Sequence, residues 1–88
     1  MKVQIRKMSK EDAEKEGIFD WPTWSCDVSE FDWEYPEEEK CYFIQGKVTV
    51  VAEDGQEYHI ESGDFVVFPK GLKCRWIVKE PVLKHYNF

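Results

Sequence analysis

Residues 39–76 read EKCYFIQGKVTVVAEDGQEYHIESGDFVVFPKGLKCRW, and runs of four to six apolar or β-branched residues alternate in it with breaks that contain glycine. This pattern predicts consecutive antiparallel strands joined by tight turns. The Asp54-Gly55 pair is the strongest turn signal, because a type I′ hairpin needs two residues that tolerate positive φ. We therefore expect this half of the chain to be a meander of short strands, and Glu80-Pro81 predicts a further break before a closing strand over residues 82–88.

The spacing of glycine and proline in this stretch resembles the two sequence motifs of the cupin superfamily. The first motif ends in a glutamate, six residues and a glycine, which Glu39 and Gly46 match. The second is matched by Gly63, Pro69 and Gly71 but has a cysteine, Cys74, where the family has a histidine. The resemblance covers roughly residues 17–88 and implies an all-β fold, the cupin jelly-roll barrel or double-stranded β-helix, with one short N-terminal helix.

Length and composition are typical of one small globular domain, which we expect to span residues 1–88. Hydrophobic residues make up 42% of the chain and aromatic residues 16%, enough to fill a core at this length. The net charge of −6 argues against a nucleic-acid partner, because phosphate binding needs a basic surface.

No segment is apolar over the roughly 18 residues that a membrane-spanning helix requires, so we expect no membrane partner. The N-terminal residues run into charged residues and do not resemble a signal peptide. Three cysteines without a Cys-x-x-Cys pair are typical of reduced thiols. These features favour a cytoplasmic location.

Patterns in residues 2–35 predict two further strands and the helix. Residues 2–7 alternate between apolar and polar side chains, which is typical of a half-exposed strand. Ser9 and the acids after it predict the start of a helix of about two turns that ends near Gly17 and lies outside the barrel. Residues 31–35 alternate three aromatic side chains with two carboxylates, so we expect one face of this strand to be buried and the other to face solvent.

Metal-binding members of the superfamily usually hold their ion with a His-x-His pair, the motif glutamate and the histidine of the second motif. Counting back from Glu39 with the commoner gap places Trp33 and Tyr35 at the His-x-His positions. Tryptophan cannot ligate a metal and a neutral tyrosine is a poor ligand. We therefore expect no cofactor; the alternative is a weak site where Glu39 and Cys74, with Tyr35, hold a soft divalent ion.

A gap one residue longer would instead place Asp32 and Glu34 at those positions. Strand parity favours the first alignment, because it directs the aromatic side chains inward and the carboxylates outward.

Glu39 is the strongest candidate for a functional residue. Its strand parity places it on the face of Cys41 and Phe43, and a carboxylate on an inward face needs a partner or a shifted pKa. It would act as an acid or base, or pair with a bound amine whose cation also lies on an aromatic ring. The expected ligand-binding residues are Trp33, Tyr35, Glu39, Cys41, Phe43, Cys74 and Trp76. Alternatively, Trp33 and Tyr35 only fill the barrel.

The residues from Glu39 to Gly46, together with a tryptophan shortly after Pro69-Lys70-Gly71, resemble the small DUF861 cupins. These include the ureidoglycine aminohydrolase type and the similar ethanolamine-utilisation cupins. The resemblance implies, for the former, a bound manganese and the release of ammonia from a ureido-substituted amine. Because the histidine ligands are missing, that activity does not transfer directly to this chain.

Three functions remain open. We prefer a metal-free cupin that binds a small polar or amine-bearing metabolite. The first alternative is an enzyme of the ureidoglycine aminohydrolase or isomerase kind, with Glu39 as catalytic base and Tyr35 as acid or hydrogen-bond donor. The second is a structural or interaction domain with a filled barrel. Strands 65–68 and 74–78 are apolar on both faces, and a second layer supplied by a partner copy would make a homodimer.

Overall fold

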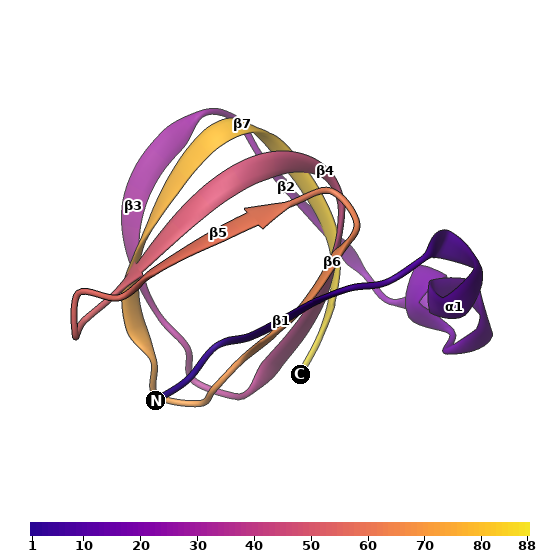
Figure 1. The fold of residues 1–88 in the computed structure, drawn as a ribbon, viewed down its shortest axis with the longest axis horizontal. Coiled ribbons are helices and arrows are strands. Elements are labelled where there is room, and N and C mark those ends of the chain that lie inside the picture. The colour runs from indigo at the N-terminus through magenta and orange to yellow at the C-terminus, as the bar shows by residue number, and fades with distance from the viewer.

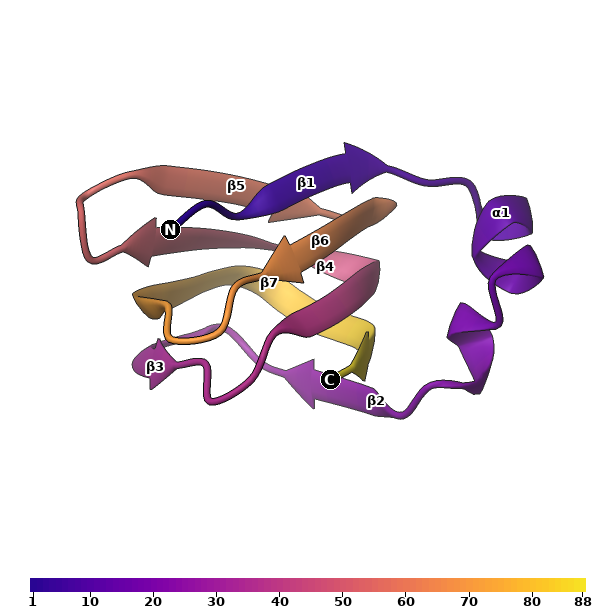
Figure 2. The same cartoon turned by 90° about the horizontal axis from the view of Figure 1, so that it is seen from below.

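The computed structural model describes all of residues 1–88 as a rolled sheet of seven antiparallel strands with a short helix at one end (Figures 1 and 2). The strands are β1 (Gln4–Lys7), β2 (Thr23–Cys26), β3 (Ser29–Glu34), β4 (Glu39–Ala52), β5 (Glu57–Glu61), β6 (Asp64–Phe68) and β7 (Lys73–Asn87). The helix is α1 (Lys10–Lys15), and a 3₁₀ turn, η1 (Ile18–Asp20), follows it. The expected all-β barrel with one short N-terminal helix is confirmed.

Two long strands, β4 and β7, form the centre of the sheet and pair with each other from Lys40 opposite Asn87 to Ala52 opposite Cys74. Four shorter strands each pair with one half of a long strand. Strand β6 pairs with the first half of β4 and β5 with its second half, while β3 pairs with the first half of β7 and β2 with its second half. Strand β1 extends the sheet beyond β6. Each long strand therefore curves around the barrel and changes its outer partner midway (Figure 1).

The breaks at Gly46 and Pro81 lie inside strands, so the prediction of separate short strands there is wrong. The pairing of β4 with β7 shifts register around Gly46, which forms a bulge. A Cβ on Gly46 would collide with the carbonyl oxygen of Pro81 and lie 2.7 Å from the Cα of Val82. Gly46 also has a φ of 106°. The glycine permits close backbone approach where the strands bend, and does not end the strand.

The turn between β4 and β5 also differs from the predicted type I′ geometry. Only Gly55 has positive φ (89°), and no residue other than glycine does. The Gly55 N–H donates to the Ala52 carbonyl, and Asp54 Oδ1 accepts from the Gln56 N–H. Asp54 thus caps a four-residue loop through its side chain, an arrangement typical of aspartate in turns.

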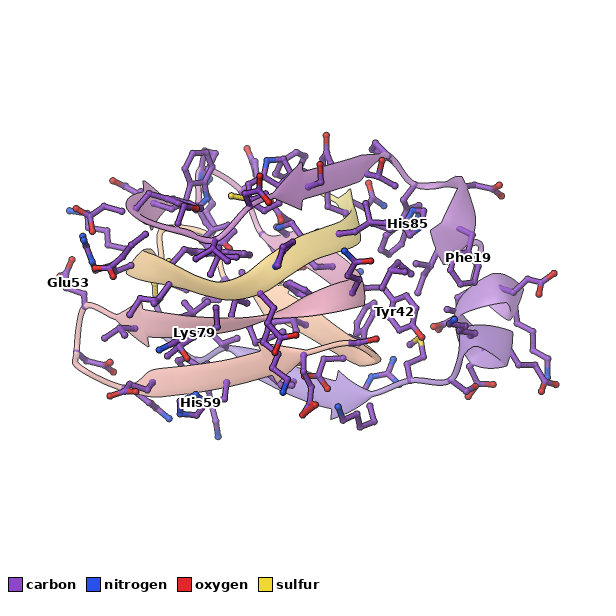
Figure 3. All side chains as sticks on the ribbon, turned by 90° about the horizontal axis from the view of Figure 1, so that it is seen from above. Phe19, Tyr42, Glu53, His59, Lys79 and His85 are labelled. Carbon is purple, nitrogen blue, oxygen red and sulfur yellow. The ribbon has the colours of Figure 1, made fainter.

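Helix α1 begins as predicted, with the Ser9 hydroxyl accepting from the Asp12 N–H, and ends before Gly17, whose φ is 74°. It lies outside the barrel, at one end (Figure 2). A small apolar cluster that joins it to the sheet contains Met8, Ala13, Ile18 and Tyr42. In Figure 3, Phe19 reaches from η1 toward Tyr42 and His85, and its ring packs edge-on against both. The helix segment therefore covers this end of the barrel.

The main core lies inside the barrel and contains sixteen buried residues. The alternation predicted for residues 31–35 is confirmed in part: Asp32 and Glu34 are exposed and Tyr35 is buried, but Trp33 is 46% exposed. Strand β1 is exposed at all four positions and only Val3, before it, is buried, because β1 lies at an edge of the sheet. With six residues in α1 and three in η1, neither helical segment could span a membrane.

Candidate functional site

An aromatic cavity of about 350 Å³ opens into the barrel interior. Its walls come from β2, β3, β4 and β7, the residue after β3 and the residue after β7. The aromatic lining residues are Trp24, Phe31, Trp33, Tyr35, Trp76, Tyr86 and Phe88. Two charged side chains, Glu39 from β4 and Lys84 from β7, complete the lining, which is otherwise aromatic. Such a cavity combines stacking surfaces with a single polar position.

Glu39 and Lys84 form a buried ion pair at that position. Lys84 Nζ donates to Glu39 Oε2 at 2.7 Å, and the two side chains are only 6% and 7% exposed. The Cys41 thiol donates to the same oxygen at 2.9 Å, and Lys84 Nζ also lies 3.4 Å from Cys41 Sγ. Both hydrogen bonds to Glu39 use Oε2, so Oε1 keeps its capacity to accept from a ligand.

The pairing of β4 with β7 brings these side chains together. Glu39, Cys41 and Phe43 alternate along β4 and share one face, as expected from strand parity. Lys84 lies opposite Phe43 in the ladder, and Tyr86 lies opposite Cys41. The long Lys84 side chain therefore extends past Cys41 to reach Glu39.

Aromatic rings surround the Lys84 ammonium group. Its Nζ lies 4.8 Å from the Trp76 ring centroid and 5.1 Å from that of Trp24, with Phe43 and Phe68 each at 5.9 Å. The negative faces of aromatic rings attract a cation, more strongly where water is excluded. Glu39 and the rings together compensate for the loss of hydration that burial imposes on this ammonium.

Tyr35 is a neutral hydrogen-bonding group in the cavity. Its hydroxyl oxygen accepts from Trp76 Nε1 at 3.2 Å. Burial raises the pKa of Tyr35 far above its ordinary value of 10.0, and the nearby Cys41, Glu39 and Cys74 raise the pKa further. Burial likewise raises the pKa of the Cys41 thiol, although Lys84 opposes the shift. Both groups keep their protons at neutral pH and can donate hydrogen bonds.

Four of the seven predicted ligand-binding residues line this cavity: Trp33, Tyr35, Glu39 and Trp76. Cys41 and Phe43 are fully buried behind its surface. Cys74 lies instead on a second depression, and its thiol donates weakly to the Trp33 carbonyl at 3.6 Å. Burial, with Asp32 nearby, raises the pKa of the Cys74 thiol to about 11.

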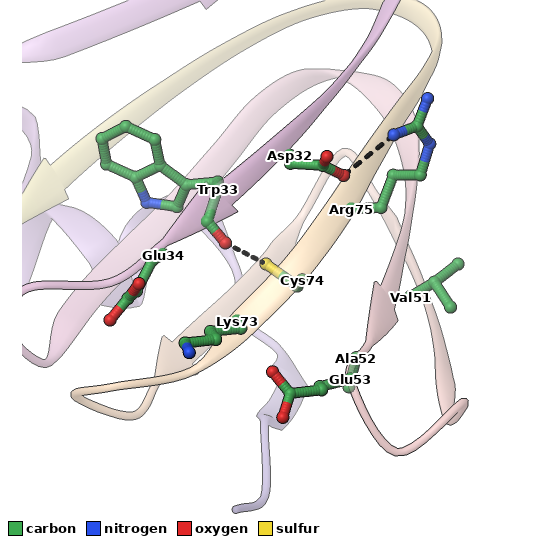
Figure 4. A pocket seen from close by; sticks show the side chains of 9 residues that line it. All are labelled: Asp32, Trp33, Glu34, Val51, Ala52, Glu53, Lys73, Cys74 and Arg75. Atoms are coloured by element: carbon green, nitrogen blue, oxygen red, sulfur yellow. Dashed lines mark hydrogen bonds and ion pairs between the residues drawn. The ribbon is translucent and has the colours of Figure 1, made fainter.

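This second depression is a wide groove of about 660 Å³ at the edge of β3, β4 and β7 (Figure 4). Arg75 donates to Asp32 at 2.8 Å and to Glu30 at 2.6 Å, so its charge is paired with theirs. Figure 4 shows Glu34, Lys73 and Glu53 pointing from the groove rim. The groove lacks the buried, converging polar groups of the aromatic cavity.

Sequence reasoning missed Lys84, the residue most important to the cavity. The signal present in the sequence is the alternation of Val82, Lys84 and Tyr86, which places the lysine among apolar neighbours on one strand face. A lysine in such a pattern is ordinarily attributed to an exposed face, and only the pairing with β4 shows that the face is internal.

The donor set does not fit the metal that the superfamily usually binds. The structure contains no group of three or more histidine, cysteine or acidic side chains placed to hold an ion. The neighbours of Glu39 are the Lys84 ammonium group, which cannot ligate a cation, and the Cys41 thiol, which donates a hydrogen bond to the carboxylate. Trp33 and Tyr35 offer no suitable ligand at the first pair of positions.

A family model described as the EutQ-like cupin domain matches residues 13–86. Among solved structures, a DUF861 family protein from Thermotoga maritima is 53% identical, with a TM-score of 0.94 and 99% of each chain covered. The EutQ protein of Clostridium difficile is 21% identical, with a TM-score of 0.67 over 96% of this chain and 64% of that one. A putative ethanolamine utilization protein Q from Salmonella typhimurium is 19% identical, with a TM-score of 0.66 and coverages of 98% and 68%. No protein of curated function matches.

Proposed function

Because this chain belongs to the EutQ-like cupin family, we propose that it binds a small polar or amine-bearing metabolite in the aromatic cavity without a metal ion. The observation that carries the proposal is the buried Glu39–Lys84 pair among aromatic walls. A buried ion pair contributes little net stability compared with apolar residues of similar volume. Its position at the cavity surface is therefore better explained by ligand recognition.

The geometry of the cavity supports a proposal for the kind of ligand. A volume of about 350 Å³ suits a small molecule, and the indole and phenyl rings favour a flat or apolar body. The polar end would meet Lys84 Nζ as a donor and Glu39 Oε1 as an acceptor. A group that both accepts and donates, such as an amide, satisfies both; a charged amine would use Glu39 but be repelled by Lys84.

We further propose that Lys84 replaces the metal centre of the superfamily. Its ammonium supplies a fixed positive charge beside the motif glutamate, held by Glu39 and surrounded by rings. Elemental analysis of the purified chain, before and after incubation with manganese, zinc, nickel and iron, tests this. Less than stoichiometric metal is expected, and stoichiometric metal would refute the replacement.

The alternatives receive less support. An enzyme with Glu39 as base needs the carboxylate to accept a proton from the substrate, whereas the protons within reach of its Oε2 belong to Lys84 and Cys41. Tyr35 as an acid would have to release a proton that burial holds firmly. A filled barrel is disfavoured by the cavity itself.

NMR titration with benzamide, benzylamine and benzoate tests the proposal, since the three share one ring and differ in the polar end. We expect benzamide to shift the indole N–H signals of Trp24 and Trp76 most strongly. Glu39→Gln should weaken its binding by about tenfold, the loss expected for one hydrogen bond to a charged group. The control Glu38→Gln, at an exposed position, should bind as the parent does. Absence of shifts with all three probes would refute a binding cavity.

A further inference from the structure

We propose that Lys84 is a nucleophile that condenses reversibly with a small aldehyde or ketone bound in the aromatic cavity. The inference rests on the proposed binding function and narrows the ligand to a carbonyl compound. It assigns a covalent step to this cavity, in which the lysine does more than donate a hydrogen bond.

The first observation is the environment of the amine. Of the ten lysines in the sequence, Lys84 alone is buried, and it lies on the cavity lining. Lysines that form Schiff bases in proteins are activated by apolar surroundings, because these favour the neutral amine that attacks a carbonyl carbon. The rings of Trp24 and Trp76 cover two sides of the buried Nζ, but their faces also attract its positive charge, so the amine becomes nucleophilic only when it gives a proton to Glu39.

The second observation is a proton acceptor already in position. Glu39 Oε2 lies 2.7 Å from Lys84 Nζ, within the distance required for direct proton transfer. Transfer of one proton converts the ion pair into a neutral amine and a neutral carboxylic acid.

The reaction balances with these groups alone. The neutral Lys84 amine attacks the carbonyl carbon, a C–N bond forms and the C=O π bond breaks, and a proton passes from the attacking nitrogen to the oxygen, which becomes the hydroxyl of a carbinolamine. Glu39 returns its proton to that hydroxyl, which leaves as water as the C–N double bond forms. The products are a protonated imine, one water and the original carboxylate, with no net oxidation or reduction.

The product would retain the contacts of the starting ammonium. A protonated imine carries one positive charge at Nζ, which keeps its attraction to Glu39 and to the Trp76 ring. The carbonyl substituent would project into the cavity between Trp24, Phe31 and Tyr86. The aromatic lining thus favours aldehydes and ketones with a flat or apolar substituent over small hydrated ones.

Reductive trapping tests the inference on the unmodified protein. The chain is incubated near neutral pH with benzaldehyde and sodium cyanoborohydride, which reduces the imine to a stable amine, and the benzyl group is located by peptide mass spectrometry. We expect Lys84 to be labelled at least about tenfold faster than Lys47 or Lys79, which are exposed and serve as internal controls. Benzamide should block labelling at Lys84 only.

A carboxylate variant tests the proton transfer. Glu39→Gln should slow labelling of Lys84 by about a hundredfold, the lower range for general acid–base catalysis, whereas Glu38→Gln should label as the parent does. If Glu39→Gln does not fold, the comparison among lysines in the parent protein and the competition with benzamide still decide the matter.

The outcomes separate the two proposals. Binding of benzamide together with labelling confined to surface lysines would overturn the nucleophilic role of Lys84 and leave the binding function standing. Failure of benzamide to bind, with Lys84 unlabelled, would overturn both. Selective, competitive labelling of Lys84 supports both.

Discussion

A single carboxylate oxygen, Glu39 Oε2, receives hydrogen bonds from both Lys84 and Cys41. The free energy of this arrangement depends on which partner is removed. Loss of one charge leaves the other buried and unpaired, which typically costs about 3–5 kcal/mol, whereas replacement of both charges by apolar groups is often neutral or stabilising. The pair therefore makes the site specific without making the fold more stable.

A double-mutant cycle tests this account. Glu39→Gln and Lys84→Met should each lower the free energy of unfolding by about 3 kcal/mol, while the double variant should come within about 1 kcal/mol of the parent. Urea denaturation measures all four proteins. Glu80→Gln, which removes an exposed partner 3.5 Å from Lys47, is the control and should change stability by less than about 1 kcal/mol. Additive losses in the double variant would show that the two charges do not act as a pair.

Among the elements, β4 and β7 position every charged or thiol group of the cavity. Glu39 and Cys41 come from the first part of β4, and Lys84 from the second part of β7. The bulge at Gly46 lies between the two halves of β4, where β7 also changes its partner from β3 to β2. The close approach of the two backbones at this point fixes the register that brings Lys84 toward Glu39.

Gly46→Ala should therefore be strongly destabilising. The added Cβ would meet the backbone of Pro81 and Val82, and φ of 106° is strained for alanine. We expect a loss of about 3 kcal/mol or more by urea denaturation. Gly55→Ala is the matched control: φ is also positive, at 89°, but no atom lies within 4 Å of its Cβ. It should cost only about 1 kcal/mol, and equal losses at both positions would refute the role of the close contact.

For the molecule as a whole, the barrel is predictable from the sequence, but the residue that pairs with Glu39 is not. Spacing of glycine and proline, resemblance to the cupin motifs and strand parity predict the barrel, the capped helix and the inward direction of Glu39. The role of Lys84 is not predictable in this way, because its partner Glu39 lies 45 residues earlier in the chain. Only the long-range pairing of β4 with β7 shows that the face of β7 with Lys84 is buried. Gly46 and Pro81 are wrongly predicted to end strands because a bulge and a turn have the same local composition.

The buried Cys41 thiol and the buried Tyr35 hydroxyl also predict how the stability of the fold changes at alkaline pH. Burial raises the pKa of Cys41 above its ordinary 9.0 and that of Tyr35 above 10.0, so the native state keeps protons that the unfolded chain has already released. Their contribution is fully present below pH 9 and is lost as pH rises. Each group should lower the free energy of unfolding by about 1.4 kcal/mol per pH unit, Cys41 from pH 9 and Tyr35 from pH 10. Urea denaturation between pH 7 and 11 measures this, and Cys41→Ala should remove about 1.4 kcal/mol per unit from the slope above pH 9. An unchanged slope in that variant would show that the Cys41 thiol ionises as readily in the native barrel as in the unfolded chain.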